Sequence, residues 1–204
     1  VEHCLSALET AQPGPVREGC VGSGTGTVAF GWKGGVGSSS RRLPQAQGGW
    51  TLGVLVQSNF GGKLHLPGSA QREPLPALPP GSPPASPQTG ESILIVVATD
   101  APLSDRNLRR LAARALGGLA RTGASLSNNS GDYALAFSTH PGVRRTPQRR
   151  SQPGTMDELP NDLCSPLFLA AIEATEEAIY NSLFMAETTT GYEGHTAHAL
   201  PHPE

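Results

Sequence analysis

One segment limits what this chain can fold into more than any other feature of the sequence. Residues 61–91 are dense in proline, glycine and serine. Proline fixes φ and removes a backbone donor, so neither a helix nor an inner strand fits there, and we expect an exposed linker. The linker ends abruptly at SILIVVAT, residues 92–99, which is the strongest strand signal in the chain. A folded core must therefore be built from the residues on the two sides of this linker.

Hydrophobic periodicity and turn signals predict further elements on both sides of the linker. The segment TLGVLVQSNF predicts a strand buried on both faces, because its apolar run is almost continuous. One long helix should begin at Ser104 as its N-cap, and the last one at Ser165 with Pro166 as its first residue. The expected strands cover 27–32, 51–60, 92–99 and 131–139, and the expected helices cover 1–11, 105–122 and the residues after Ser165. This arrangement in blocks favours an α+β class, with layered sheets covered by helices.

The composition excludes several classes of partner. A chain of 204 residues suffices for one domain with a hydrophobic core. Its net charge of −2 gives no electrostatic reason to expect nucleic acid or an anionic membrane as a partner. No apolar run approaches the ~20 residues of a membrane span, and no signal peptide is visible. Three widely spaced cysteines indicate a reducing, cytoplasmic compartment. Because the first residue is Val1 rather than Met, a periplasmic or secreted protein whose signal lay upstream is the alternative.

Common cofactor and nucleophile motifs are absent from the sequence. The glycine-rich GSGTG at residues 22–26 is not part of a phosphate loop, because Lys33 is followed by Gly34 rather than by Ser or Thr. It does not match a dinucleotide fingerprint either, since a strand rather than a helix is expected after it. There is no G-x-S-x-G elbow, and no pair of histidines has a third partner at metal-ligand spacing. We therefore expect neither a metal nor an organic cofactor.

Ser92 is the residue with the most specific chemistry available to it. Its simplest interpretation is a serine that starts a strand. The functional interpretation is that the chain cuts itself before Ser92, which leaves a hydroxyl and a free α-amine on one residue. The reference pKa of such an amine is about 7.7–8.0, so the amine can take the proton of its own hydroxyl. The linker would then be the end released by cutting, which gives its length a reason.

Four further residues are candidates for a site around Ser92. Asn59 ends a predicted strand, and its side-chain amide could stabilise an oxyanion. Ser130 and Asp132 lie two residues apart at a strand start, so they can face the same side and relay a proton or anchor an ammonium. Lys33 is the weakest of the four. The simpler alternatives are a strand-end turn residue for Asn59, turn chemistry for Ser130 and Asp132, and a solvated surface lysine for Lys33.

Five strings resemble one family in their order and spacing. They are GPVREGCVGSGTGTVAFGWKGGVGSSSR, TLGVLVQSNFG, SILIVVATDAPL, RLAARALGGLARTG and NNSGDYALAFST, and they lie between about residue 13 and about residue 191. Together they make the chain similar to the L-aminopeptidase/D-esterase family, which includes the β-peptidyl aminopeptidases. The resemblance implies a precursor that cuts itself before a serine, an α/β/β/α sandwich and a homotetramer.

The resemblance also implies roles for individual residues. The bond cut would be Glu91–Ser92, which divides one domain into an α chain of residues 1–91 and a β chain of residues 92–204 that stay together. Family members are longer on the N-terminal side, so the sandwich is expected to be incomplete there. The implied catalytic residues are Ser92 as nucleophile, Asn59 as oxyanion donor, Ser130 and Asp132 as supporting hydroxyl and carboxylate, and Lys33 as an active-site lysine.

The expected function is hydrolysis that releases N-terminal residues from small peptides, amides or esters. Two alternatives stay open. An acyltransferase of the ornithine acetyltransferase type shares the general fold, but that type uses Thr at the cut site, where this chain has Ser92. A non-catalytic remnant is favoured by the missing N-terminal region and by Glu91, because the family usually has Gly or Asn before the nucleophile. The sequence does not decide between L, D and β residues as substrates.

Overall fold

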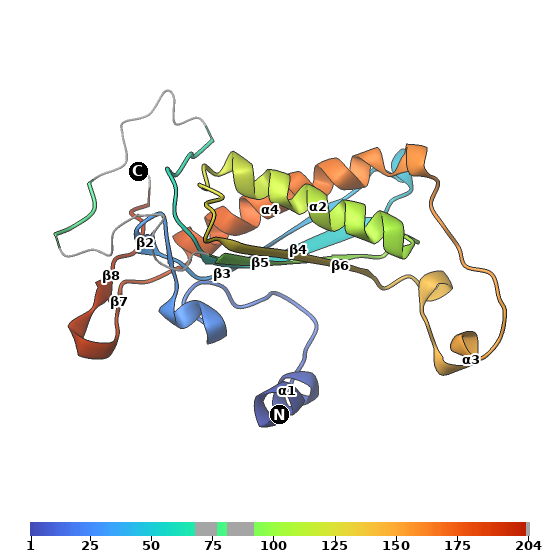
Figure 1. Ribbon diagram of the computed structural model, residues 1–204, viewed down its shortest axis with the longest axis horizontal. Coiled ribbons are helices and arrows are strands. Elements are labelled where there is room, and N and C mark those ends of the chain that lie inside the picture. Colours follow the sequence, from blue (N-terminus) through green and yellow to red (C-terminus); the bar gives the residue numbers. More distant parts are fainter. Residues whose placement is uncertain (68–76, 81–91, 203–204) are drawn as a thin grey trace.

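The computed structural model describes residues 1–67, 77–80 and 92–202. The centre of this structure is a four-stranded mixed sheet, in which β4 and β5 are the two inner strands (Figure 1). Its strands, in spatial order, are β3 (Val36–Arg42), β4 (Thr51–Asn59), β5 (Ser92–Thr99) and β6 (Gly131–Ser138). The pairs β3–β4 and β4–β5 are antiparallel, whereas β5–β6 is parallel. The strands on the two sides of the Pro-rich segment therefore meet in the middle of the sheet.

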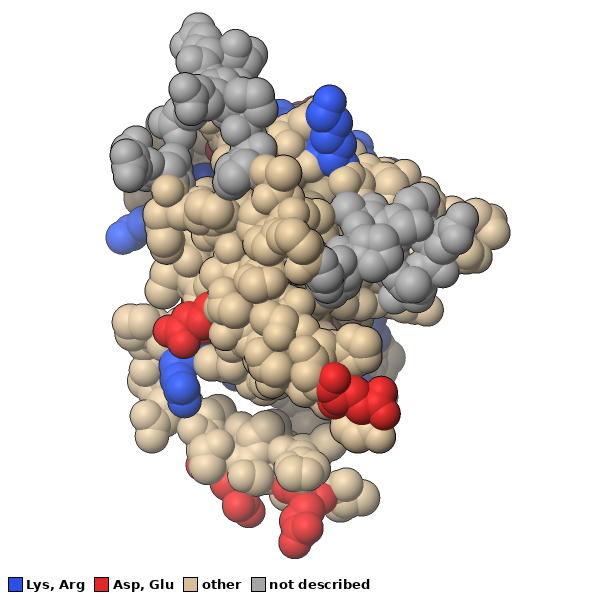
Figure 2. All heavy atoms as spheres, turned by 90° about the vertical axis from the view of Figure 1, so that its left-hand side faces the viewer, with Lys and Arg blue, Asp and Glu red and all other residues tan. Residues whose placement is uncertain are grey.

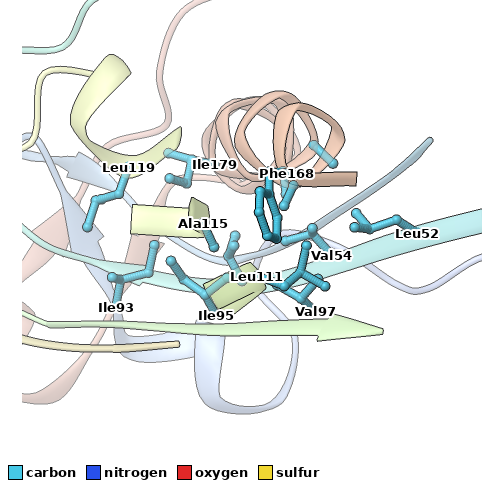
Figure 3. Close-up of a cluster of buried hydrophobic side chains, with 14 of the residues drawn as sticks. Leu52, Val54, Ile93, Ile95, Val97, Leu111, Ala115, Leu119, Phe168 and Ile179 are labelled. Atoms are coloured by element: carbon cyan, nitrogen blue, oxygen red, sulfur yellow. The ribbon is translucent and has the colours of Figure 1, made fainter. Parts of the chain in front are cut away.

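Two long helices cover one face of this sheet. They are α2 (Asp105–Arg121) and α4 (Ser165–Phe184), and they cross the same side of the strands in Figure 1. On β5, Ile93, Ile95 and Val97 point at the helices because alternate residues of a strand share a face. Figure 3 shows these three side chains packed beneath the residues of α2 and α4. Burying each such aliphatic side chain stabilises the fold by roughly 1.5–3 kcal/mol, so this layer supplies the core.

The opposite face of the sheet is apolar and open. Tyr133 and Leu135 of β6 are 68% and 63% exposed, and Leu94 and Phe137 are exposed beside them. Neither long helix lies on this side (Figure 1). The described residues thus form one helix layer and one sheet layer of the expected α/β/β/α sandwich. They do not supply the layers that would cover this open face.

Shorter elements surround the two layers. Among the described residues, no helix is long and apolar enough to cross a membrane. The short helices are α1 (Glu2–Glu9), α3 (Pro147–Arg150), η1 (Gly22–Gly26), η2 (Gln45–Gln47), η4 (Pro141–Val143), η5 (Asn161–Leu163) and η6 (Tyr192–Gly194), and the short strands are β1 (Val28–Ala29), β2 (Trp32–Lys33), β7 (Thr189–Thr190) and β8 (Thr196–Ala197). The strands pair as two small hairpins, β1 with β2 and β7 with β8.

The long elements expected from the sequence are confirmed, and several details are corrected. The expected strand at 27–32 is a hairpin, because Phe30 and Gly31 both have positive φ and form a two-residue turn. The central strand β4 has one buried face and one half-buried face, rather than two buried faces. Ser104 holds the N-cap position of α2 but its hydroxyl donates to Glu158 rather than capping the helix. The last helix has Cys164 as its N-cap and begins at Ser165, one residue earlier than expected.

The beginning of the expected linker is also ordered. Residues 61–65 run beside residues 122–125, where Lys63 N–H donates to the carbonyl of Gly123 and His65 N–H donates to that of Thr122. Farther along, residues 68–76 and 81–91 lie outside the described part of the chain. These first residues after β4 are therefore partly exposed, as expected of a linker, but they are also hydrogen-bonded to the residues at the end of α2.

The contact between α2 and α4 depends on a glycine. A Cβ at Gly118 would overlap the carbonyl oxygen of Ile172 and would lie 2.7 Å from Thr175 Cβ. A Cβ at Gly117 would lie 3.5 Å from the Ile172 side chain, which is ordinary van der Waals contact. The approach of α2 to Ile172 and Thr175 of α4 therefore requires a residue without a Cβ at position 118.

This difference gives a matched pair of variants. Either Gly→Ala change raises helix propensity by about 1 kcal/mol, so Gly117→Ala should raise the free energy of unfolding. Gly118→Ala should lower it by roughly 1–3 kcal/mol, because overpacking separates the helices. Urea unfolding followed by circular dichroism measures both. Equal effects from the two substitutions would show that the helix crossing is not as close as described.

Candidate functional site

Ser92 and Asn59 meet at one end of the sheet. Ser92 is the first residue of β5 and Asn59 is the last residue of β4, and the antiparallel register makes them direct partners. Gly131, the first residue of β6, is the partner of Ser92 on its other side. Residues directly opposite in a sheet share a face, with Cβ atoms about 4.5–5.5 Å apart. Because Ile93 and Ser58, the next residues inward, face the core, Ser92 and Asn59 both face the open side.

A backbone donor fixes the orientation of the Asn59 amide. Val28 N–H donates to Asn59 Oδ1 at 3.1 Å. Only the oxygen of the amide can accept this bond, so the Nδ2 group is directed elsewhere, with its two N–H donors available to another acceptor. The β1–β2 hairpin that carries Val28 is anchored by Phe30, whose N–H donates to the Phe60 carbonyl and whose ring packs edge-on against the Phe60 ring at 4.9 Å. Asn59 is thus held as a hydrogen-bond donor.

Ser130 and Asp132 form a hydrogen-bonded pair at the same end of the sheet. The Ser130 hydroxyl donates to Asp132 Oδ1 at 2.7 Å, which confirms that the two side chains face the same way. In the β5–β6 register Asp132 is the partner of Ile93, so strand alternation puts its side chain on the face opposite to that of the Ser92 side chain. The Asp132 side chain therefore lies on the helix side of the sheet next to the start of β5, and not on the face of the Ser92 side chain.

Lys33 is buried, contrary to the solvated alternative. Its side chain is 1% exposed, and its ammonium donates to the carbonyls of Gly24 at 2.7 Å, Thr27 at 3.0 Å and Gly34 at 2.7 Å. Burial lowers the pKa of Lys33, and the neighbouring Cys20 thiol acts in the opposite direction. Lys33 belongs to β2 of the hairpin, where it is the strand partner of Val28, the residue that contacts Asn59. All three of its N–H donors are already used there.

Three further features bear on the site: the predicted residue Glu91, a cavity on the N-terminal segment, and the surface at this end of the sheet. Glu91 lies outside the described residues. A cavity of about 370 Å³ lies between the N-terminal segment and the residues that end α4, and none of the predicted site residues lines it. Its walls are Val16, Arg17, Glu18, Cys20, Val21, Met185 and Glu187. Figure 2 views the end of the molecule where β4 finishes and β5 begins, and its described surface carries only scattered charged side chains.

Sequence reasoning missed two participants. Val28 acts through its backbone N–H, which has no residue-type signature and could only have been found from the hairpin geometry. Gly131 stands opposite Ser92, where a Cβ would lie 3.6 Å from Ser92 Cβ. The same Cβ would lie 3.4 Å from the Tyr133 ring, so both contacts would be ordinary van der Waals contacts, and Gly131 lies between these two side chains. A glycine at a strand start was the available signal.

Comparison with known proteins identifies relatives of this arrangement. The chain is 43% identical to the β-peptidyl aminopeptidase BapA of Sphingosinicella microcystinivorans, with all of this chain and 54% of that protein covered. The solved structure of the PH0078 protein from Pyrococcus horikoshii OT3 superposes with a TM-score of 0.81 at 41% identity, over 98% of this chain and 54% of that one. The chain spans about half the length of the relatives it matches.

A further solved structure gives the fold. It is the L-aminopeptidase D-Ala-esterase/amidase of Ochrobactrum anthropi, which its title describes as a prototype of the serine aminopeptidases with a new variant of the Ntn hydrolase fold. It superposes with a TM-score of 0.78 at 35% identity, over 97% of this chain and 53% of that one. The helix layer on a mixed sheet is thus part of that fold. The family model of peptidase family S58 matches residues 1–197, and the chain belongs to this family.

Proposed function

We propose that this chain carries the nucleophile of a self-cleaving serine aminopeptidase, which releases N-terminal residues from small peptides, amides or esters. The observation that supports this most strongly is the register of Ser92 with Asn59, whose amide is oriented as a donor by Val28. A nucleophile and an oxyanion donor side by side are what acyl transfer requires. The printed names of the relatives, a β-peptidyl aminopeptidase and an L-aminopeptidase, agree with this reaction class.

Maturation is the first reaction. Ser92 Oγ attacks the carbonyl carbon of Glu91, the C–N bond between the two residues breaks, and an ester forms in its place. The α-amine of Ser92 leaves with the proton that the hydroxyl gave up. Water then hydrolyses the ester and frees the carboxyl group of Glu91. The fragments stay together because the whole of β4 is hydrogen-bonded along β5 across the cut. The cut would thus divide one domain into two chains, residues 1–91 and residues 92–204.

Turnover uses the same groups in the cleaved protein. Ser92 Oγ attacks the scissile carbonyl of the substrate while the Ser92 α-amine takes its proton. Asn59 Nδ2 donates to the oxyanion, and collapse of the intermediate expels the leaving amine or alcohol. Water completes the cycle by releasing the acyl group. Ser130 accepts a hydrogen bond from the amine, and Asp132 holds the Ser130 hydroxyl in position. Assembly into homotetramers is part of the same prediction.

Self-cleavage gives the first test. Purified protein should separate on a denaturing gel into fragments of residues 1–91 and 92–204, with masses that place the cut at Glu91–Ser92. Ser92→Ala should stay whole, because it lacks the attacking oxygen. Asn59→Ala should be cut roughly 100- to 1000-fold more slowly, by analogy with the loss of one oxyanion donor. Ser6→Ala, exposed on α1 away from the sheet, serves as the control. A wild-type chain that stays whole over days would contradict the proposal.

The pH dependence of turnover gives the second test. For the cleaved protein, kcat/KM on an aminoacyl p-nitroanilide should rise with pH as the Ser92 amine, a group with a reference pKa of about 7.7–8.0, loses its proton. A carboxylate near an ammonium stabilises the protonated form and raises the amine pKa. Asp132→Asn should therefore move the rising limb to lower pH and also lower its plateau.

Asp162→Asn, in η5 before α4, is the matched control and should leave the profile in place. An unmoved profile in Asp132→Asn would show that this carboxylate does not act on the amine.

A further inference from the structure

We infer that Lys33 is a positioning residue, which holds the peptide group between Thr27 and Val28 so that Val28 orients the amide of Asn59. This inference rests on the proposed function, because it assigns to Asn59 the role of oxyanion donor. It differs from an active-site lysine that touches the substrate. The link runs from a buried ammonium through one backbone peptide group to a side chain beside the nucleophile.

The first step is the environment of the Lys33 ammonium. An ammonium has three N–H donors, and three backbone carbonyls converge on this one, those of Gly24, Thr27 and Gly34. The described ion pairs do not include Lys33, so the three carbonyl dipoles, with the Cys20 thiol beside them, stabilise its buried charge. Burying a charge is costly unless it is fully hydrogen-bonded. The three carbonyls satisfy the ammonium completely and leave it no donor for a substrate.

The second step is the peptide group itself. The Thr27 carbonyl and the Val28 N–H belong to the same planar unit, so fixing one end fixes the direction of the other. The carbonyl accepts from Lys33 Nζ at 3.0 Å and from Gly34 N–H at 3.0 Å, and the N–H donates to Asn59 Oδ1 at 3.1 Å. A cation on the carbonyl oxygen also polarises the peptide and strengthens its N–H as a donor, because hydrogen bonds in a chain reinforce one another. Lys33 therefore both aims and strengthens the bond to Asn59.

The third step is the consequence for Asn59. Asn59 is the last residue of β4, so no following residue of that strand fixes its side chain. Without the bond from Val28, the amide could turn and present Oδ1 instead of Nδ2 to the position beside Ser92. An oxygen there would repel an oxyanion, whereas the N–H group stabilises it. The correct orientation of the amide is therefore what Lys33 secures.

The residue type fits this role. A guanidinium is planar and spreads its donors over a fork, so arginine cannot direct three hydrogens at carbonyls that converge on one point. An isosteric methionine fills the space but offers no donor. Two of the three carbonyls keep another partner without Lys33, since Gly24 also accepts from the Thr27 hydroxyl at 3.1 Å and Thr27 also accepts from Gly34 N–H. Lys33→Met should therefore fold while losing the link.

The test uses two readouts on this chain. In the ¹⁵N-labelled protein, the Val28 amide proton should exchange with solvent about tenfold faster in Lys33→Met than in wild type, as expected for one weakened hydrogen bond. The Asn59 side-chain amide signals should move at the same time. Lys33→Arg should lie between the two, and it replaces Lys33→Met if that variant does not fold. The exposed Lys63→Met is the matched control, with no change expected at either signal.

The second readout is a double-mutant cycle on the rate of self-cleavage. If Lys33 acts through Asn59, Lys33→Met slows cleavage of wild type by about tenfold or more but has no further effect in Asn59→Ala. Independent effects that multiply in the double variant would overturn the inference. If wild type is not cleaved at all, the proposed function fails, while the exchange experiment still decides whether Lys33 controls Val28 and Asn59. Unchanged Val28 exchange in both Lys33 variants would overturn the inference by itself.

Discussion

The antiparallel pairing of β4 with β5 is the interaction on which the rest of this structure depends. It joins the part of the chain before the Pro-rich segment to the part after it, from Leu52 opposite Thr99 to Asn59 opposite Ser92. The same register puts Leu52, Val54 and Val56 on the face that α2 and α4 bury, so core packing and site geometry are fixed together. A slip of one residue would turn Ser92 toward the core and Ile93 toward the open face.

How much of this could be read from the sequence depends on the kind of signal. Strand β5 and helix α2 carry strong apolar patterns, and both were predicted closely. Strand β3 was missed, because VGSSSRR has no apolar alternation. Its stability comes from tertiary contact instead: a Cβ at Gly37 would overlap the carbonyl oxygen of Ala178 on α4, so the small residue is what lets the helix lie on the strand. A propensity scale cannot register that contact.

In the candidate site, too, some features could be predicted from the sequence and others could not. Ser92, Asn59, Ser130 and Asp132 could be proposed from residue type and family resemblance, and the structure adds their register. The orientation of the Asn59 amide could not be proposed, because it depends on the backbone of Val28 and on the positive φ of Phe30 that turns the hairpin. Lys33 could be proposed as a site residue, but its hydrogen-bond partners could not be predicted. The three carbonyls around it come from a loop and a turn whose shape no local sequence pattern specifies.

The position of Ser92, the proposed nucleophile, explains how the end of a cut chain could keep a defined geometry. A chain terminus normally frays, and a catalytic serine on a loose end would lose the geometry that acyl transfer needs. Ser92 is instead held between two neighbouring strands, with β4 on one side and β6 on the other. Cutting before the first residue of a central strand would therefore free the α-amine while the backbone carrying it stays paired. That arrangement reconciles a free terminus with a rigid site, and it requires the cut to fall at the strand start rather than within the preceding segment.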